Sequence, residues 1–397
     1  MARRDPLAKR LKRHVIGPAH DFFAATSPPL EPLCLRELSD LAPGLKTARP
    51  TAGGVEFTAR LEDCYAANLM LRIPNRILMR IATFKATHFK QMEKKALDIP
   101  WELYLSRRAK PVLHVKTVRC RLHHTTAIAD RLVPAIQSRI IDSPISLNPA
   151  APQANIQRIF VRGSKDRFLV SLDSSGNLLF KRGLKRKVGK APLRETLAAA
   201  ILQAAKYSGA EPLVDPMCGS GTFSLEAAMI AGRIPPGWFR TFAFMTWPAF
   251  KKNQWEYLKK IHSPPSQHSA VPMIFAADTS ASLCSHLEGI SKQFGLSGMI
   301  RVLHKNFFEW MPADVSPQRG LVVLNPPFGI RMAFNSPAED YYREIIKKLK
   351  KDYRGWRLAL LFPDIAVTRK FCKNLKNIPI YHGGLRLRLL IGSADNL

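Results

Sequence analysis

Two short stretches of the chain combine residue types that could bind a ligand and orient a reacting group. In the first, LVDPMCGSGTF at residues 213–223, an apolar strand ends at a carboxylate, turns through small residues and opens into a helix. Gly219 and Gly221 would let a ligand approach the backbone at the carboxyl end of a parallel strand. A dinucleotide-binding turn would have a third glycine where Ser224 stands, and a P-loop would have a lysine in the turn, so neither phosphate motif fits.

The second stretch, LVVLNPPFG at residues 321–329, is an apolar strand followed by two consecutive prolines. Because proline ends strand pairing and stiffens the chain, the prolines would hold the Asn325 side chain and the Pro326 carbonyl as fixed hydrogen-bond acceptors. Phe328 would place an aromatic ring beside them. This arrangement suits a planar base with an exocyclic amine, whose two N–H groups meet the acceptors while the ring stacks on the base.

Strands and helices that alternate along the second half of the chain are expected to position both stretches. A helix over residues 194–206 precedes the first stretch, and the later apolar segments MIFAAD, MIRVLH and RLALLFP read as further strands separated by helices. This alternation predicts a parallel sheet that is covered on both faces.

The first half of the chain has a different pattern. A β-α-β-α-β order in about sixty residues from Asp21 predicts a small α+β domain. A further strand precedes an amphipathic helix, in which apolar residues recur at four-residue steps from Ile128 to Ile140. We therefore expect a basic arm at residues 1–20, an α+β region at 21–160 and an α/β domain at 161–397.

The charge of the chain indicates a polyanionic partner. Lys plus Arg number 61 against 30 for Asp plus Glu, which gives a formal net charge of +31. Such a surplus of like charge is offset by binding nucleic acid. A basic linker before the α/β domain would follow phosphates beside the site, although a merely solvated linker is the alternative. Its cations are Lys181, Arg182, Lys185, Arg186, Lys187, Lys190 and Arg194.

Other classes of protein are disfavoured by what the sequence lacks. No stretch has the roughly 20 consecutive apolar residues of a membrane helix, and the first residues lack the apolar core of a secretion signal. The six cysteines are widely scattered and have no metal-ligand spacing. We therefore expect no metal site, no disulfide scaffold and no membrane partner, and a location in the reduced cytoplasm.

The two stretches together resemble the class I S-adenosylmethionine-dependent nucleic-acid amino-methyltransferases, which share Asp-Pro-x-Cys-Gly-Ser-Gly-Thr followed by Asn-Pro-Pro-Phe. More narrowly, APLRETLAAAIL, PLVDPMCGSGTFSLEAAMIA, PPGWFRTFAFMTW and LNPPFG resemble the THUMP-containing guanine-N2 RNA methyltransferases, in particular the ribosomal RNA large-subunit methyltransferase L group in a short form with one catalytic domain. DFFAAT, VKTVRCRLHHTTAIADRL and NIQRIFVRG resemble the amino-terminal half of that family. The resemblance implies a Rossmann-like methyltransferase domain preceded by an α+β ferredoxin-like and THUMP region that binds RNA.

Site residues follow from the resemblance by position. Asp278 would accept hydrogen bonds from the ribose hydroxyls, although an ordinary helix cap is the alternative. Asn306 and Phe307 would contact the adenine, where the family usually has Asp in place of Asn306. Ile330 stands where the family tends to have Glu. The residues around the methionine end of S-adenosylmethionine would be Asp215, Pro216, Gly219, Ser220, Gly221 and Thr222, and the catalytic turn would be Asn325, Pro326, Pro327 and Phe328.

These assignments imply methyl transfer from S-adenosylmethionine to the exocyclic N2 amine of a guanine, in structured RNA and most simply in large-subunit ribosomal RNA. Catalysis would rest on orientation and fixed dipoles, without a metal or a covalent intermediate. Three alternatives stay open: a guanine-N2 methyltransferase of transfer RNA, an adenine-N6 methyltransferase, and a non-catalytic RNA-binding assembly factor. The oligomeric state does not follow from the sequence.

Overall fold

The computed structural model describes residues 7–41, 45, 47–141, 155–184, 193–265, 273–327 and 338–397. The chain forms two compact units that are not continuous in sequence. The first unit comprises Met1–Ser27, Cys34–Leu179 and Arg240–His262, and the second comprises Pro28–Leu33, Phe180–Phe239 and Ser263–Leu397.

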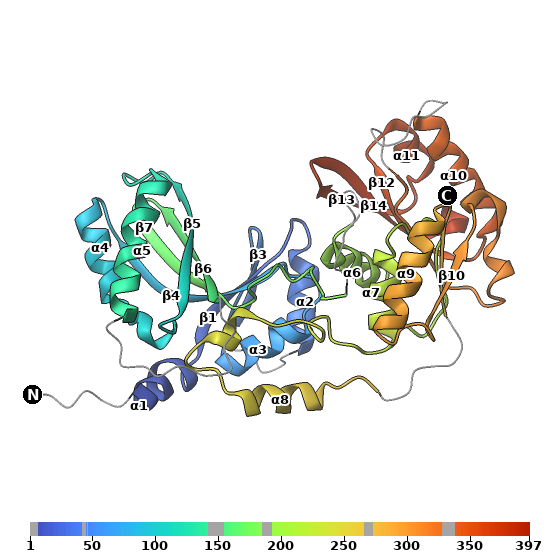
Figure 1. Ribbon diagram of the computed structural model, residues 1–397. Helices are drawn as coiled ribbons and strands as arrows, with labels where there is room; N and C mark the ends of the chain where they lie inside the picture. The colour runs from blue at the N-terminus through green and yellow to red at the C-terminus, as the bar shows by residue number, and fades with distance from the viewer. Residues whose placement is uncertain are drawn as a thin grey trace, which may run out of the picture. The chain divides into compact units, whose positions relative to one another are not determined.

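A seven-stranded sheet forms the centre of the first unit, in the order β2-β3-β1-β4-β7-β6-β5 (Figure 1). Its strands are β1 (His20–Ala25), β2 (Thr47–Thr51), β3 (Gly54–Ala59), β4 (Arg76–Lys85), β5 (Ala109–Val118), β6 (Asn155–Ser164) and β7 (Arg167–Asp173). The boundary expected between residues 160 and 161 falls inside β6. The first unit continues to Leu179 because β6 and β7 hydrogen-bond into its sheet.

The helices of the first unit each bury apolar residues, and α3 and α5 pack on strands of this sheet. They are α1 (Leu7–Leu11), α2 (Glu31–Leu41), α3 (Leu61–Met70), α4 (Phe89–Asp98) and α5 (Thr125–Ile141). Ile128, Leu132, Ile136 and Ile140 are all buried along α5, as their four-residue spacing predicts. No helix in the described ranges is long and apolar enough to cross a membrane.

The expected basic arm is folded where the structure describes it. α1 and the π-helical turn Lys12–Ile16 bury Leu11 and Val15. Arg10 donates to the Glu102 carboxylate through its Nη2 atom at 2.5 Å. Residues 7–16 therefore pack on the first unit and do not form an extended arm, whereas residues 1–6 lie outside the described part of the chain.

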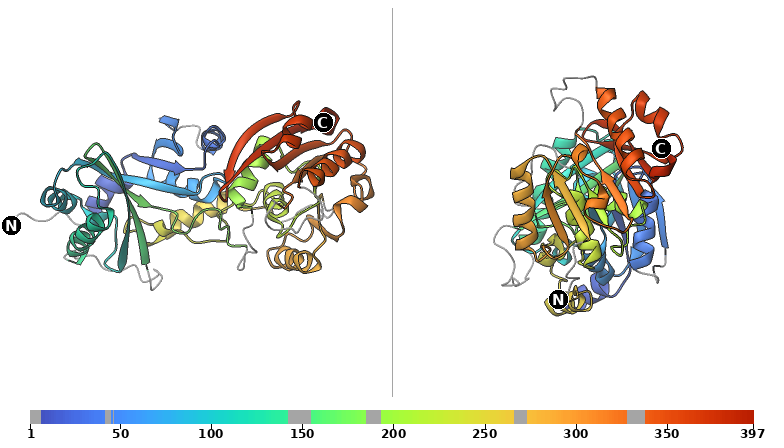
Figure 2. Two further views of the ribbon diagram at one scale, coloured as in Figure 1. Left: turned by 90° about the horizontal axis from the view of Figure 1, so that it is seen from above. Right: turned by 90° about the vertical axis from the view of Figure 1, so that its right-hand side faces the viewer.

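The sheet of the second unit has the order β10-β9-β8-β11-β12-β14-β13. The first five of these strands are parallel, and β14 pairs antiparallel with both β12 and β13. Figure 2 shows the chain in two further views. This mixed α/β sheet confirms the expected class I methyltransferase fold. Its elements are α6 (Glu195–Ala204), β8 (Leu213–Asp215), α7 (Thr222–Ala231), β9 (Ile274–Asp278), α9 (Ala281–Gln293), β10 (Ile300–His304), β11 (Leu321–Leu324), α10 (Ala338–Asp352), β12 (Arg357–Pro363), α11 (Ala366–Phe371), β13 (Lys376–His382) and β14 (Leu385–Ser393).

The segment Arg240–His262 belongs to the first unit, although it follows α7 in the chain. The Phe244 ring stacks on Tyr65 of α3, with ring centroids 4.3 Å apart. The Trp247 indole N–H donates to the Gln157 side chain of β6 at 2.8 Å. α8 (Lys252–Ile261) follows and buries Trp255. These buried aromatic residues complete the core of the first unit.

Candidate cofactor and base-binding site

Polar residues follow four neighbouring strands at one edge of the second sheet. β8 ends at Asp215, and β9 beside it ends at Asp278. β10 pairs with β9 up to its last residue, His304, and Asn306 comes two residues later. Asn325 comes directly after β11, which pairs with the other side of β8. Because all four strands are parallel, their carboxyl ends lie along one edge, where such sheets bind ligands.

The glycine-rich turn after β8 adopts a backbone that favours glycine. Gly219 and Gly221 have φ angles of +53° and +73°, and α7 begins directly after Gly221. A Cβ atom on Gly221 would lie 2.4 Å from Cδ1 of the buried Leu287, whereas one on Gly219 would meet no atom of the described residues within 4 Å. The turn is therefore closed against α9 at Gly221 and open at Gly219, where a ligand can reach the backbone.

Asp215 is almost completely buried, and Ser224 holds its side chain. The Ser224 hydroxyl donates to Asp215 Oδ2 at 2.7 Å. Ser224 occupies the position where a dinucleotide-binding turn would have glycine, so the hydroxyl there orients the carboxylate at the strand end. This contact gives the departure from the dinucleotide motif a structural reason.

Asp278 connects the end of β9 to the glycine-rich turn. Its Oδ2 atom accepts a hydrogen bond from the Gly219 backbone N–H at 2.9 Å, and its Oδ1 atom accepts one from Ser280 N–H at 2.9 Å. The cap of α9 is Ser280, whose hydroxyl accepts from Leu283 N–H. Asp278 is therefore not the helix cap, and its carboxylate retains lone pairs that can accept from ribose hydroxyls.

The two residues expected to contact adenine have different environments. Asn306 is partly exposed; its Oδ1 atom accepts from Phe308 N–H at 3.1 Å, and its amide donates to Glu309 at 3.2 Å. Phe307 is only 2% exposed, and its ring lies 6.0 Å from that of Tyr353 in the hydrophobic core. Phe308, which is 40% exposed, is the ring of this pair available to a ligand. Phe307 stays a prediction, and we add Phe308 to the candidate site.

Tyr341 of α10 is a site residue that the sequence reasoning missed. Its hydroxyl donates to Met217 Sδ at 3.6 Å, and its ring lies 6.2 Å from that of Phe308. Burial and the nearby carboxylate of Asp278 raise the pKa of Tyr341 to about 12, so the hydroxyl stays protonated at neutral pH. No sequence signal distinguishes Tyr341 from other helix residues, because its role depends on how α10 packs beside the turn.

The Asn325 turn presents a buried acceptor. Asn325 Oδ1 has no hydrogen-bond partner among the residues that the structure describes. The Tyr342 hydroxyl donates to the Pro327 carbonyl at 3.1 Å and holds the turn from α10. The expected stacking ring, Phe328, and the neighbouring Ile330 lie outside the described residues. A buried acceptor at a ligand-binding edge is suited to receive an N–H donor.

The described cations of the basic linker differ in exposure. Arg182 is 3% exposed, and its guanidinium forms a buried pair with Glu226 of α7, with Nε donating to Oε1 at 2.8 Å. Arg182 is therefore removed from the expected RNA-binding set, because its charge is already neutralised inside the unit. Lys181 and Arg194 are exposed, and the other expected cations, Lys185, Arg186, Lys187 and Lys190, lie outside the described residues.

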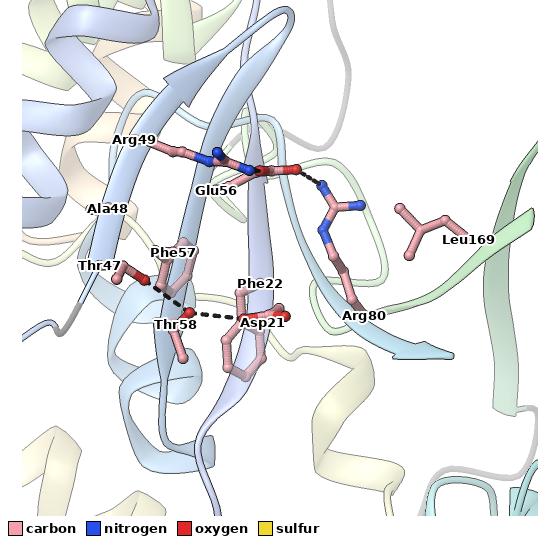
Figure 3. Close-up of a pocket in the computed structure, with 10 residues that line it drawn as sticks. All are labelled: Asp21, Phe22, Thr47, Ala48, Arg49, Glu56, Phe57, Thr58, Arg80 and Leu169. Carbon is pink, nitrogen blue, oxygen red and sulfur yellow. Dashed lines mark hydrogen bonds and ion pairs between the residues drawn. The ribbon is translucent and has the colours of Figure 1, made fainter. Parts of the chain in front are cut away.

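The first unit carries a pocket of about 710 Å³, and every residue lining it belongs to a strand (Figure 3). Glu56 lies between Arg49 at 2.8 Å and Arg80 at 2.6 Å. Thr58 donates to Asp21 at 2.8 Å on the same wall. No residue of a described helix is among those that line the pocket, so this face of the sheet is open there.

Aromatic rings and arginines share that face farther along the sheet. Phe160 of β6 stacks on His114 of β5 with ring centroids 4.9 Å apart, and the Arg76 guanidinium lies 5.4 Å from the Phe160 centroid. Arg162 lies 5.7 Å from the ring of Phe23. Strand pairing places these residues on the face that carries the pocket. We call it the open face, defined by Arg49, Glu56, Arg80, Phe23, Arg76, Arg162, Phe160 and His114.

Comparison with known proteins agrees with this geometry. The family model for the RMKL-like methyltransferase domain matches residues 182–384, just over half of the chain. The model for the RlmL ferredoxin-like domain matches residues 21–78.

Similar proteins extend over nearly the whole chain. "Putative RNA methyltransferase slr0064" of Synechocystis sp. is 29% identical and aligns with 93% of this chain and 95% of its own length. "Ribosomal RNA large subunit methyltransferase K/L" of Methylococcus capsulatus is 31% identical over 94% of this chain and 51% of its own length, so the chain spans about half of that relative.

A solved structure shares the complete fold. The crystal structure of SMU.472, described as a putative methyltransferase complexed with SAH, has a TM-score of 0.82 and 25% identity, and covers 96% of this chain and 100% of its own. The matched family models, the parallel sheet and the glycine-rich turn lead to one conclusion. The chain belongs to the RMKL-like family of class I, S-adenosylmethionine-dependent methyltransferases and carries an RlmL ferredoxin-like domain in its amino-terminal half.

Proposed function

We propose that this protein transfers a methyl group from S-adenosylmethionine to the exocyclic N2 amine of a guanine in large-subunit ribosomal RNA. The observation that carries the proposal is the buried Asn325 Oδ1 atom, which has no partner among the described residues and follows the strand next to the glycine-rich turn. A guanine N2 amine has two N–H groups, and one of them would satisfy this acceptor.

The residues of the site would act on the amine by orientation. S-adenosylmethionine supplies a methyl group on a positively charged sulfur. Asn325 and the Pro326 carbonyl would accept the two N–H groups, so that the nitrogen lone pair points toward the methyl carbon. In this transfer the new N–C bond would replace the C–S bond of the cofactor, and the methylated amine would release one proton to water. Holding the two reactants in line removes much of the entropic cost of their encounter.

The cofactor would be held by the residues around the glycine-rich turn. Asp278 is fixed by Gly219 N–H and would accept from the ribose hydroxyls. Tyr341 and Phe308 would form an aromatic wall on the adenine side, beside Asn306. Gly219, Ser220, Gly221 and Thr222 would surround the methionine end, because the turn is open at Gly219. The Asp278 carboxylate and the open backbone at Gly219 fit such a ligand.

RNA is the substrate class that the charge supports. The net charge of +31 favours a polyanionic partner, whose phosphates would reduce the repulsion among the surplus cations. The open face of the first unit would offer the rings of Phe160 and His114 to unpaired bases, with arginines for phosphates. The target guanine would leave its stack to reach Asn325, as bases do in enzymes that modify them.

Mass spectrometry of modified nucleosides tests the proposal directly. Purified protein and S-adenosylmethionine are incubated with ribosomal RNA and, separately, transfer RNA from cells that lack the protein. We expect N2-methylguanosine to form in the large-subunit ribosomal RNA. Formation of N6-methyladenosine would show that the target base is adenine. A product in transfer RNA alone would show that the substrate is transfer RNA. Absence of any product from a protein that binds S-adenosylhomocysteine would contradict the proposed activity.

Replacing Asn325 by alanine should abolish turnover without loss of the cofactor. The side chain contacts the reacting amine in the proposal, so the rate should fall by roughly 10²–10³, as for the loss of one fixed polar group in other active sites. The dissociation constant of S-adenosylhomocysteine, measured by calorimetry, should stay within about twofold. Asn377→Ala, at an exposed position on β13, is the matched control. Equal rates in both variants would remove Asn325 from the mechanism.

A further inference from the structure

Three arginines surround one aspartate just beyond the end of β12. Asp364 accepts from Arg369 Nε at 2.8 Å and from Arg388 Nε, and Arg386 Nε lies 3.2 Å from its other carboxylate oxygen. These hydrogen bonds hold the pKa of Asp364 down to about 2, so the carboxylate is ionised throughout the neutral range. We call these four residues the Asp364 cluster. Its formal charge is +2, because three cations share one anion.

Strand register brings the Asp364 cluster to the same edge as the Asn325 turn. β11 and β12 are parallel, with Leu324 opposite Leu360, so Asn325 and Asp364 both follow strands that run toward this edge. The Tyr342 side chain connects the two. Its hydroxyl donates to Pro327, and its ring lies 5.4 Å from that of Phe362, two residues before Asp364. Arg386 and Arg388 enter from β14, which pairs with β12.

Two of the arginines extend into solvent although the aspartate does not. The Arg386 and Arg369 side chains are 65% and 56% exposed, whereas the Asp364 side chain is 5% exposed. The Nε atom of Arg386 faces the carboxylate, and the exposure of this side chain leaves its guanidinium accessible from solvent. The Tyr381 ring, 64% exposed, comes from the residue opposite Arg386 on β13.

We propose that the Asp364 cluster binds a phosphodiester group of the RNA strand next to the methylated nucleotide. This inference rests on the proposed function. A base that leaves its stack needs its flanking backbone held, and the planar guanidinium fork suits phosphate oxygens. Asp364 holds the fork in place beforehand, which reduces the rotamer entropy lost on binding. Arg386 would make the main contact, with Arg369 beside it.

The test compares Arg386→Ala with wild-type protein in RNA methylation and RNA binding. We expect the KM for RNA to rise roughly tenfold, as for the loss of one charge-assisted hydrogen bond, with kcat within about twofold. The slope of log affinity against log salt should become shallower by about 0.7. Arg386→Lys keeps the positive charge but loses the planar guanidinium group, so its KM for RNA should lie between those of wild-type protein and Arg386→Ala.

Lys376→Ala is the matched control, because it removes one exposed cation from the same hairpin at its opposite end, where Lys376 pairs with Ile391. Unchanged affinity for S-adenosylhomocysteine shows that each variant is folded, and Arg369→Ala replaces Arg386→Ala if that variant does not fold. The proposal is overturned if the arginine variants match Lys376→Ala in both KM and salt slope. Wild-type protein that methylates no RNA would refute the proposed function instead, and the salt slopes of RNA binding would still test the cluster.

Discussion

Asp278 and Asn325 lie at the same edge of the sheet, and their side-chain oxygens differ in whether they already accept hydrogen bonds. The Asp278 carboxylate already accepts two backbone N–H groups, so its orientation is set before any ligand binds. Asn325 Oδ1 is buried without a partner in the described residues. Leaving a buried acceptor unpaired costs about 1–3 kcal/mol. An amine donor at that position would recover this cost, which makes Asn325 selective for bases that carry one.

The two glycines of the turn should respond differently to alanine. Gly221→Ala combines a left-handed φ with a contact on Leu287, so we expect a loss of about 2–4 kcal/mol in the free energy of unfolding. Gly219→Ala has the backbone strain alone, about 1–2 kcal/mol, but its methyl group enters the space open to a ligand. Urea unfolding measures stability, and calorimetry measures S-adenosylhomocysteine binding.

The prediction is tested by which variant loses more stability and which loses more cofactor affinity. Gly221→Ala should lose more stability, whereas Gly219→Ala should lose a larger share of its cofactor affinity than its stability explains. Two variants with the same loss of stability and the same affinity would show that the turn is not open at Gly219.

At the scale of elements, a buried ion pair attaches the segment before α6 to α7. Arg182 and Glu226 side chains are 2% and 1% exposed and are joined by two hydrogen bonds. A buried pair of this kind contributes little net stability, but loss of one partner leaves an unpaired charge in the interior. The pair therefore fixes where the linker enters the second unit.

Glu226→Ala should lower the free energy of unfolding by about 3–5 kcal/mol, because the buried Arg182 charge would lose the Glu226 carboxylate. The double variant Arg182→Met with Glu226→Leu should recover most of this loss. Glu256→Ala breaks the exposed Lys252–Glu256 pair of α8 and should cost less than about 1 kcal/mol. Urea unfolding gives all three values, and a loss under about 1 kcal/mol in Glu226→Ala would contradict a buried pair.

Elements defined by local pattern could be predicted, whereas those defined by distant contacts could not. Strands ending at Asp215 and Asp278 follow from apolar runs and a terminal carboxylate. The β13–β14 hairpin was not predicted, because its strands gain their place only by pairing with β12. The burial of Arg182 and Phe307 could not be predicted for the same reason: each lies beside an exposed residue, and only packing determines which of the two is buried.

At the scale of the whole molecule, basic residues are distributed over both units. Arg49, Arg80 and Arg162 lie on the open face of the first unit, and the Asp364 cluster lies on the second. Affinity for RNA should therefore come from many phosphate contacts, each of which releases counterions. Base identity would depend on the Asn325 acceptor.

RNA binding should fall steeply with salt. With roughly six phosphates contacted at about −0.7 each for a single strand, the slope of log affinity against log salt should be about −4. Fluorescence anisotropy with a labelled ribosomal RNA fragment measures it, and Arg162→Gln on the open face should make it shallower by about 0.7. Binding of S-adenosylhomocysteine is the control and should change little. A slope shallower than about −1 would contradict a phosphate-dominated interface.

The Arg240–His262 segment has a consequence for how the protein is made. The core of the first unit includes Phe244 and Trp247 from this segment, so a nascent chain released after Leu179 lacks them. The amino-terminal half cannot finish folding until the ribosome has also translated the glycine-rich turn and α7. The first unit therefore finishes folding only after part of the second unit has been synthesised. Because segments of the two units alternate along the chain, a single crossover in the gene could not exchange one unit and leave the other intact.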